Sequence, residues 1–78
     1  NLPILKIDKD SITIVDVLKL LNFCKSNGEG RRLIKGKGIK LNDKLVVDEN
    51  LVILKKEIKN KKTKVSVGKK RHALIFFS

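Results

Sequence analysis

The stretch that decides the fold is KSNGEGRRLIKGKGIKLN, residues 25–42. Ser26 is followed three residues later by Glu29, which is the spacing of a capping box. In that motif a serine hydroxyl and a glutamate carboxylate satisfy the free amides at the start of a helix. The pattern predicts a short helix through Lys35 that stops at Gly36. The last residues of the stretch alternate apolar and polar side chains, which is typical of a strand entering a turn.

Upstream of this stretch, the sequence predicts a first helix. Ser11 and Thr13 are candidate caps, and Asp16 lies three residues after Thr13, as in a capping box. Apolar residues then recur at steps of three and four and define one helical face. These residues are Ile14, Val17, Leu18, Leu21 and Cys24. We expect the helix to end near residues 22–25, and the apolar segment Pro3 to Ile7 to form a short strand or extended lead before it.

The second predicted helix has an apolar side and a basic side. Its apolar residues can pack on the first helix, and Gly30 lets the two backbones approach closely. The apolar side consists of Gly30, Leu33 and Ile34, and the basic side of Arg31, Arg32 and Lys35. The product is a capped helix of two turns with cations along its rim.

Downstream, the alternation of side chains predicts two β-hairpins. The first occupies residues 39–47 and turns at residues 42–43, and the second occupies residues 64–76. Gly68 supplies the positive φ that the second turn needs. Between the hairpins, residues 48–50 are predicted to form a turn, residues 51–58 a strand or a short helical turn, and residues 60–62 a solvated loop.

This order of elements predicts an α+β fold, with two N-terminal helices packed on a small antiparallel sheet. A chain of 78 residues buries roughly 60% of its unfolded surface and has room for one modest core. We therefore expect residues 1–78 to form a single domain. Because the chain starts at Asn1 rather than Met, we expect it to be a piece of a longer protein.

The charge of the chain is strongly positive and clustered. Nineteen Lys and Arg against eight Asp and Glu give a net charge of +11 and a pI near 10.1. Residues 25–44 carry +5 and residues 55–72 carry +8. Two basic blocks on a folded scaffold indicate a protein that binds polyanions such as nucleic acid. The alternatives are a lysine-rich surface without such a role and a module for anionic membranes. A membrane module needs an amphipathic helix with a basic face. Residues 1–24, which contain the first predicted helix, are charge-neutral, so the sequence argues against a membrane module.

Catalytic, metal and cofactor sites find little support in the sequence. The single cysteine, Cys24, excludes an intramolecular disulfide and a multi-cysteine zinc site, and it fits a reducing, cytosolic setting. Because it ends the apolar face of the first helix, we interpret it as a buried structural thiol. His72 lacks partners for nucleophilic or general-base catalysis, so we expect a surface or half-buried strand histidine. The glycines of residues 28–38 match neither a dinucleotide fingerprint nor a phosphate loop.

The aromatic residues bear on how a nucleic acid would be bound. The three are Phe23, Phe76 and Phe77, all in apolar contexts where core packing is the expected role. Modules that read single strands by stacking need exposed aromatic side chains. We therefore expect this chain to recognise backbone and shape through Lys, Arg and the amides of the capped helix, a mode that suits folded double-helical RNA.

Residues 25–42 resemble the S-four RNA-binding domain, which is named after a ribosomal small-subunit protein. That family shows a Ser, a helix of the form Glu-Ala-Arg-x-Leu-Ile, a glycine turn and a strand that reaches an Asn at a hairpin. This chain has Gly30 in place of the usual Ala and Asp43 in place of the usual Gly. The lead at residues 2–5, the doubled arginine and the tail at residues 67–75 look like the C-terminal domain of bacterial tyrosyl-tRNA synthetases.

The resemblance implies a domain tethered behind catalytic and anticodon-region domains that grips the variable arm and anticodon stem of a tyrosine tRNA. It also implies a cytoplasmic parent that uses ATP, is a homodimer and ligates tyrosine to tRNA, whereas this piece alone is expected to be monomeric and inactive, with no cofactor of its own. The RNA-facing residues carried over by matching position are Lys25, Ser26, Asn27, Arg31, Arg32, Lys35, Lys37, Lys40 and Asn42. Further RNA-facing residues are expected at the tip of the second hairpin, and these are Lys69, Lys70 and Arg71. Weaker candidates precede that hairpin, and these are Lys55, Lys56, Lys59, Lys61 and Lys62.

One alternative within the same fold remains open. The domain could belong to an RNA-modifying enzyme such as a pseudouridine synthase, or to a ribosome-associated factor. The tail from Gly68 to Ile75 argues against this alternative, because generic members of the S-four family usually end earlier.

Overall fold

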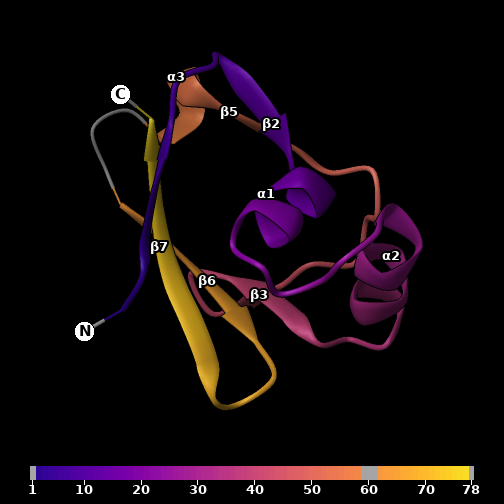
Figure 1. The fold of residues 1–78 in the computed structure, drawn as a ribbon. Coiled ribbons are helices and arrows are strands. Elements are labelled where there is room, and N and C mark those ends of the chain that lie inside the picture. Colours follow the sequence, from indigo (N-terminus) through magenta and orange to yellow (C-terminus); the bar gives the residue numbers. More distant parts are fainter. Residues whose placement is uncertain (1, 59–61, 78) are drawn as a thin grey trace.

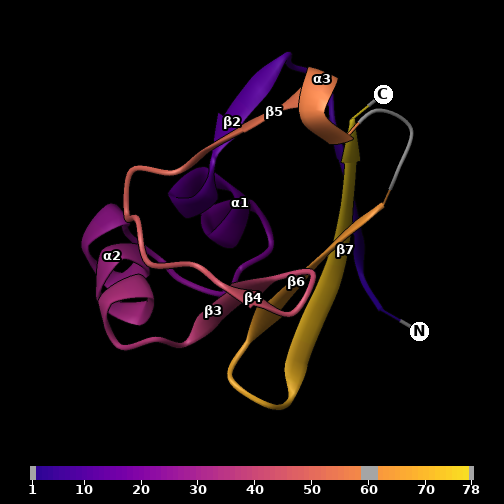
Figure 2. The same ribbon diagram turned by 180° about the vertical axis from the view of Figure 1, so that it is seen from behind.

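The computed structural model of the chain describes residues 2–58 and 62–77. Within these ranges the helices are α1 (Ile14–Leu20), α2 (Asn27–Lys35) and α3 (Lys55–Ile58). The strands are β1 (Ile4–Ile7), β2 (Ser11–Thr13), β3 (Ile39–Leu41), β4 (Lys44–Leu45), β5 (Val52–Leu54), β6 (Thr63–Val67) and β7 (Arg71–Phe77). Figures 1 and 2 show the arrangement from opposite sides. The predicted α+β class is confirmed; of the predicted loop at 60–62, residues 60 and 61 lie outside the described ranges.

The larger sheet has the strand order β1-β7-β6-β3-β4. Both predicted hairpins are confirmed, and β6 joins them by pairing antiparallel with β3. β1, however, runs parallel to β7, with Ile4 opposite Leu74 and Ile7 opposite Phe77. The expectation of a purely antiparallel sheet is wrong at this edge. A tight turn shows only that the two strands it joins are antiparallel. β1 and β7 are separated by almost the whole chain, so no turn between them indicates their relative direction.

A second, two-stranded sheet pairs β2 antiparallel with β5. Ser11, which was a candidate helix cap, lies in β2 opposite Leu54. The ambiguous segment at residues 51–58 contains both of the predicted alternatives in succession, β5 and then α3. The backbone N–H of Lys55 donates to the carbonyl of Asp10 over 2.8 Å. This small sheet therefore holds the middle of the chain against the segment that leads into α1.

α1 begins at the predicted cap and ends earlier than predicted. The Thr13 hydroxyl accepts a hydrogen bond from the Asp16 amide at 3.2 Å, as the capping box requires. The helix ends at Leu20, and Asn22 takes a left-handed conformation with φ of 61°. Asparagine tolerates this conformation better than most residues, so it ends the helix as glycine often does. Cys24 thus lies beyond α1 and not on its apolar face.

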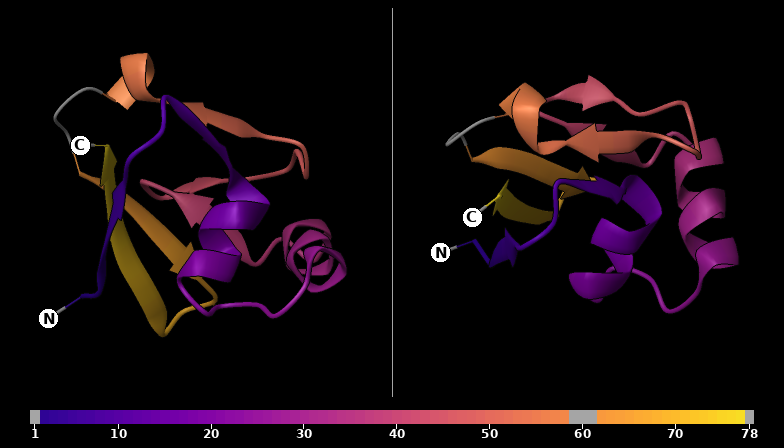
Figure 3. Two further views of the ribbon diagram at one scale, coloured as in Figure 1. Left: turned by 45° about the horizontal axis from the view of Figure 1, so that its top comes forward. Right: turned by 90° about the horizontal axis from the view of Figure 1, so that it is seen from above.

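The core lies between the larger sheet and the helices α1 and α2, which lie together on one side of that sheet (Figure 3). Along β7, Ala73, Ile75 and Phe77 are buried, whereas the residues between them are only half-buried. Alternate residues of a strand point to opposite faces, so one face of β7 packs on the core. Phe76 alternates with these residues and points to the other face, so its expected role in the core is wrong. In the described ranges, no helix is long and apolar enough to cross a membrane.

Candidate RNA-binding surface

The second capping box forms almost as predicted and fixes the start of α2. The Ser26 hydroxyl accepts a hydrogen bond from the Glu29 amide at 3.2 Å. The Glu29 carboxylate accepts from the backbone N–H of Lys25 at 3.3 Å, one residue before the position of an ideal box. Ser26, Asn27 and Lys25 are all exposed. Two of the predicted RNA-facing residues therefore also serve, through hydroxyl or amide, to begin the helix.

The inner side of α2 packs closely on α1, as predicted. Gly30 and Ile34 are buried. A Cβ at Gly30 would lie 3.2 Å from the Val15 Cγ1 and 3.3 Å from the Cys24 Sγ. These distances are shorter than ordinary van der Waals contact, so alanine at this position would require the Val15 or Cys24 side chain to shift by a few tenths of an ångström, whereas glycine fits without a shift.

The outer side of α2 presents the three predicted cations. Arg31, Arg32 and Lys35 are exposed. Lys35 Nζ lies 3.5 Å from Oε2 of Glu49, in the turn before β5. Arg31 lines a cavity together with Glu49, so these two cations face an acidic side chain from another part of the chain. The sequence analysis did not identify Glu49 as a neighbour of these cations. The only indication in the sequence was that residues 45–54 carry two acidic residues and no basic ones.

The C-terminal end of α2 places a lysine in an unusual backbone conformation. The helix ends at Gly36, as predicted, but Lys37 is the residue that adopts the left-handed φ of 61°. The Lys37 amide bonds to the Ile34 carbonyl at 3.0 Å, and the Gly38 amide to the Leu33 carbonyl at 2.9 Å. This pair of bonds is a Schellman motif, in which glycine usually takes the left-handed position. The exposed side chain of Lys37 is thereby held at the end of the helix.

The tip of the second hairpin lies against this helix end. The Gly68 amide donates to the Gly38 carbonyl at 2.9 Å, and Gly68 has the predicted positive φ, at 66°. Lys69 and Lys70 follow in the turn and are exposed, as is Arg71 at the start of β7. Two loops far apart in the sequence thus lie side by side. We name as the basic surface the exposed cations of α2 and of these two loops, Arg31, Arg32, Lys35, Lys37, Lys69 and Lys70.

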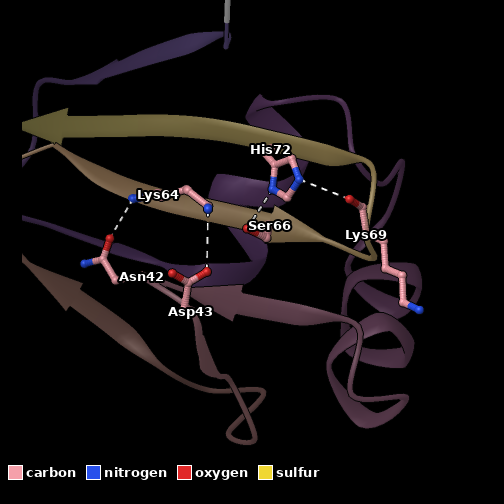
Figure 4. Close-up of polar contacts among 6 residues, drawn as sticks. All are labelled: Asn42, Asp43, Lys64, Ser66, Lys69 and His72. Atoms are coloured by element: carbon pink, nitrogen blue, oxygen red, sulfur yellow. Dashed lines mark hydrogen bonds and ion pairs between the residues drawn. The ribbon is translucent and has the colours of Figure 1, made fainter.

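His72 braces the same hairpin tip (Figure 4). Its Nδ1 lies 2.9 Å from the hydroxyl oxygen of buried Ser66, and its Nε2 lies 3.2 Å from the carbonyl oxygen of Lys69. The side chain is half-buried, as expected from the sequence. Since a carbonyl only accepts, Nε2 carries a proton and donates it. Sequence reasoning did not foresee the structural role of Ser66.

The tip of the first hairpin is ordered by Asn42 (Figure 4). Asn42 and Asp43 have φ values of 49° and 68°, the left-handed pair that a tight type I′ turn needs. The Asn42 side-chain oxygen accepts from the Lys64 amide at 2.9 Å, and Asp43 lies 3.5 Å from the Lys64 ammonium. Lys40 is exposed and lies between buried Ile39 and half-buried Leu41 along β3, so it points to the sheet face away from the core. β4 ends at Leu45, two residues earlier than predicted.

Of the weaker lysine candidates, the three that the structure describes lie outside the basic surface. Lys55 and Lys56 are exposed on α3, which lies beside the small sheet at the opposite end of the molecule from the tip of the second hairpin (Figure 1). Lys62 is exposed and immediately precedes β6. Lys59 and Lys61 lie outside the described residues. The structure therefore separates the lysines of α3 from the cations of the basic surface, whereas the net charge counts both groups together.

Cys24 is buried and has the features of an inert thiol. Burial raises the pKa of the Cys24 thiol, and the nearby Glu29 carboxylate raises it further. The thiolate is the reactive form, so a raised pKa opposes nucleophilic or redox chemistry here. In residues 2–58 and 62–77, no group of three His, Cys, Asp or Glu side chains is placed to hold a metal ion.

Comparison with known proteins identifies the family. Residues 1–75 match the family of the tyrosine–tRNA ligase SYY-like C-terminal domain. The chain is 42% identical to the tyrosine–tRNA ligase of Pelagibacter ubique over 76 residues, which cover 92% of this chain and 19% of the relative. It is 39% identical to the tyrosine–tRNA ligase of Rickettsia felis over 80 aligned positions, covering 96% of this chain and 20% of the relative.

The chain thus spans about a fifth of the length of these relatives. The matched region and the small α+β fold agree with the resemblance found in residues 25–42 and their flanks. The chain belongs to the family of tyrosine–tRNA ligase SYY-like C-terminal domains.

Proposed function

We propose that this domain binds the tyrosine-specific tRNA on behalf of a tyrosine–tRNA ligase and contacts the variable arm and anticodon stem through the basic surface. The observation that carries the proposal is the hydrogen bond between Gly68 and Gly38. It sets Lys69 and Lys70 beside Lys37 at the end of α2. Cations that come together from separate loops match the closely spaced phosphates of folded RNA better than they match the phosphates of an extended single strand.

The catalytic step belongs to the part of such a ligase outside this chain. Tyrosine and ATP would be bound there, in the cytoplasm where tRNA is charged, and the whole enzyme would be a homodimer. This domain then supplies tRNA affinity and positioning and is by itself a monomer without activity or cofactor. The names of the relatives support this division, and they do not favour the alternative of an RNA-modifying enzyme or a ribosome-associated factor.

The test is a salt-titrated binding assay with three RNAs. These are tyrosine tRNA, the same tRNA with its variable arm shortened, and an unrelated tRNA with a short arm. We expect the first to bind tightest and the affinity to fall steeply with salt, with a log–log slope of roughly −4 to −5 for about six phosphate contacts. Equal affinity for all three RNAs would contradict recognition of the variable arm, and the absence of salt-dependent binding would contradict the function itself.

A further inference from the structure

The larger sheet has one face that α1 and α2 leave open, because both helices lie on its other side (Figure 3). Alternate residues of a strand point to opposite faces. The residues that alternate with the core residues of β1, β3, β6 and β7 therefore point to this open face. We call it the outer sheet face and define it by its exposed and half-buried residues, Ile4, Lys6, Lys40, Lys64, His72, Leu74 and Phe76.

The outer sheet face combines an apolar strip with lysines on either side of it. Ile4 lies opposite Leu74, which has Lys64 as its partner on the other neighbouring strand. Lys6 lies opposite Phe76 in the next row. Ile4 is 54% exposed. Leu74 and Phe76 are half-buried, and neither is among the described residues that pack against the buried core. The strip is therefore an apolar surface of its own and not an extension of the core.

The charge of the outer sheet face favours an anionic partner. Within the described part of the chain, Lys6 and Lys40 form no ion pair. Lys64 is paired with Asp43 at 3.5 Å, but the Asp43 side chain is 80% exposed. Exposed ion pairs contribute little to stability, so a phosphate can take the place of this carboxylate. A second copy of this chain is disfavoured as the partner, because each copy carries a net charge of +11.

The outer sheet face is continuous with the basic surface at the tip of the second hairpin. His72 bonds to the Lys69 carbonyl at this tip and lies opposite Ser66 in the sheet (Figure 4). Lys40 lies opposite Ser66 on the other neighbouring strand. From the first residue of β7 to Phe76 there are five steps of about 3.3 Å, or roughly 17 Å. An RNA strand that leaves the basic surface at the hairpin tip can therefore follow β7 to Phe76.

We propose that the outer sheet face binds a single-stranded segment of the RNA, with a base stacked on the ring of Phe76 and neighbouring phosphates held by Lys6 and Lys64. The proposal rests on the proposed function. Open sheet faces that present aromatic rings bind unpaired bases by stacking, and cations beside the rings hold the backbone. From the sequence, all three phenylalanines were expected in the core, which left no ring for this mode. The outward position of Phe76 supplies one.

The test compares a labelled octauridine strand with a blunt-ended RNA duplex, which offers no unpaired base. Binding to the 78-residue chain, which has its own core, is measured by fluorescence anisotropy at low salt. Phe76→Leu keeps an apolar side chain but removes the ring. We expect it to weaken octauridine binding about fivefold or more, within the range for one stacked base, and to change duplex binding less than about twofold. Unchanged octauridine affinity in Phe76→Leu would overturn the proposal.

Three further variants separate stacking from general electrostatics. Phe76→Tyr keeps the ring and should bind octauridine as tightly as the unchanged chain. Lys6→Gln removes the cation opposite the ring and should weaken octauridine binding. Lys56→Gln makes the same change of charge on α3, away from the outer sheet face, and should weaken it less. If the Lys6 and Lys56 variants lose affinity equally, the position of the cation plays no part and the assignment of this face is wrong.

A second measurement applies even if the Phe76 variants fold poorly. In nuclear magnetic resonance titrations of the unchanged chain, octauridine should move the ring-proton signals of Phe76 upfield, as stacking on a base does. The ring signals of Phe23, which packs against the core, should stay in place. Salt-dependent tRNA binding without the Phe76 shift would overturn this inference and leave the proposed function intact. A Phe76 shift that depends on protein concentration alone would indicate contact between copies and would also overturn the inference. A failure of all RNA binding would overturn both proposals.

Discussion

The side-chain oxygen of Asn42 accepts a 2.9 Å hydrogen bond from the backbone amide of Lys64, a residue 22 positions later in the chain. The Asn42 amide also donates to the Lys64 carbonyl at 2.8 Å. One asparagine therefore joins the tip of the first hairpin to β6 through both its backbone and its side chain. Its φ of 49° adds a second requirement, because few residues other than glycine and asparagine adopt this conformation easily. Asn42, carried over as an RNA-facing residue, thus has a structural role of its own.

Replacing Asn42 with Ala should destabilise the domain by about 1–2 kcal/mol, because it removes the side-chain acceptor and leaves a residue that disfavours positive φ. Asn42→Gly restores the backbone freedom and should recover part of this loss. The measurement is the free energy of unfolding in urea. An unchanged unfolding midpoint in Asn42→Ala would show that the hydrogen bond to Lys64 contributes nothing to stability.

Lys37→Gly should have opposite effects on stability and RNA binding. Glycine takes the left-handed position of a Schellman motif without strain, so the free energy of unfolding should rise by about 0.5–1 kcal/mol. The loss of one cation from the basic surface should weaken tRNA binding at the same time. Lys56→Ala, which removes a charge from α3, is the control for binding. A variant that is stabilised and yet binds as tightly as the unchanged chain would remove Lys37 from the proposed interface.

The double variant Arg31→Ala with Arg32→Ala should weaken tRNA binding by about tenfold or more, and the log–log salt slope should become shallower by about 1–2 because two phosphate contacts are lost. Both side chains are exposed, so the unfolding transition should change little. The matched control is Lys55→Ala with Lys56→Ala, which removes two charges at the far end of the molecule. Equal losses in the two double variants would mean that net charge alone, and not the position of the arginines, drives binding.

Because of Cys24, the free energy of unfolding of the domain should decrease at alkaline pH. The folded-state pKa of the thiol is raised by burial and by Glu29, whereas the unfolded value is about 8.5. The contribution of the thiol to the free energy of unfolding is therefore fully present below the unfolded-state pKa and is lost as the pH rises through the raised folded-state pKa. Urea unfolding at a series of pH values from neutral to alkaline should show a decline that is smaller in Cys24→Ala. An identical decline in both proteins would contradict the assignment to this thiol.

The sequence by itself determined the local elements of this protein. The two capping boxes follow from side chains within a few residues of the backbone amides that they satisfy. The end of α2 at Gly36 and both hairpin turns follow from the local backbone preferences of glycine, asparagine and aspartate. The basic side of α2 was equally predictable, because the helical period separates Arg31, Arg32 and Lys35 from the buried Gly30 and Ile34. The family resemblance rests on residues 25–42 and on the flanks at residues 2–5 and 67–75.

Only the tertiary structure decided which distant segments meet. The parallel pairing of β1 with β7, the small sheet of β2 and β5, and the contact between Gly38 and Gly68 all join residues that no local pattern links. The same holds for Glu49, which reaches Lys35 from another loop. Such contacts depend on how the elements share one core, since a strand edge or a free carbonyl takes whichever partner that packing brings within hydrogen-bonding distance. The sequence therefore predicts the cations of the basic surface, but the fold decides which of them act together.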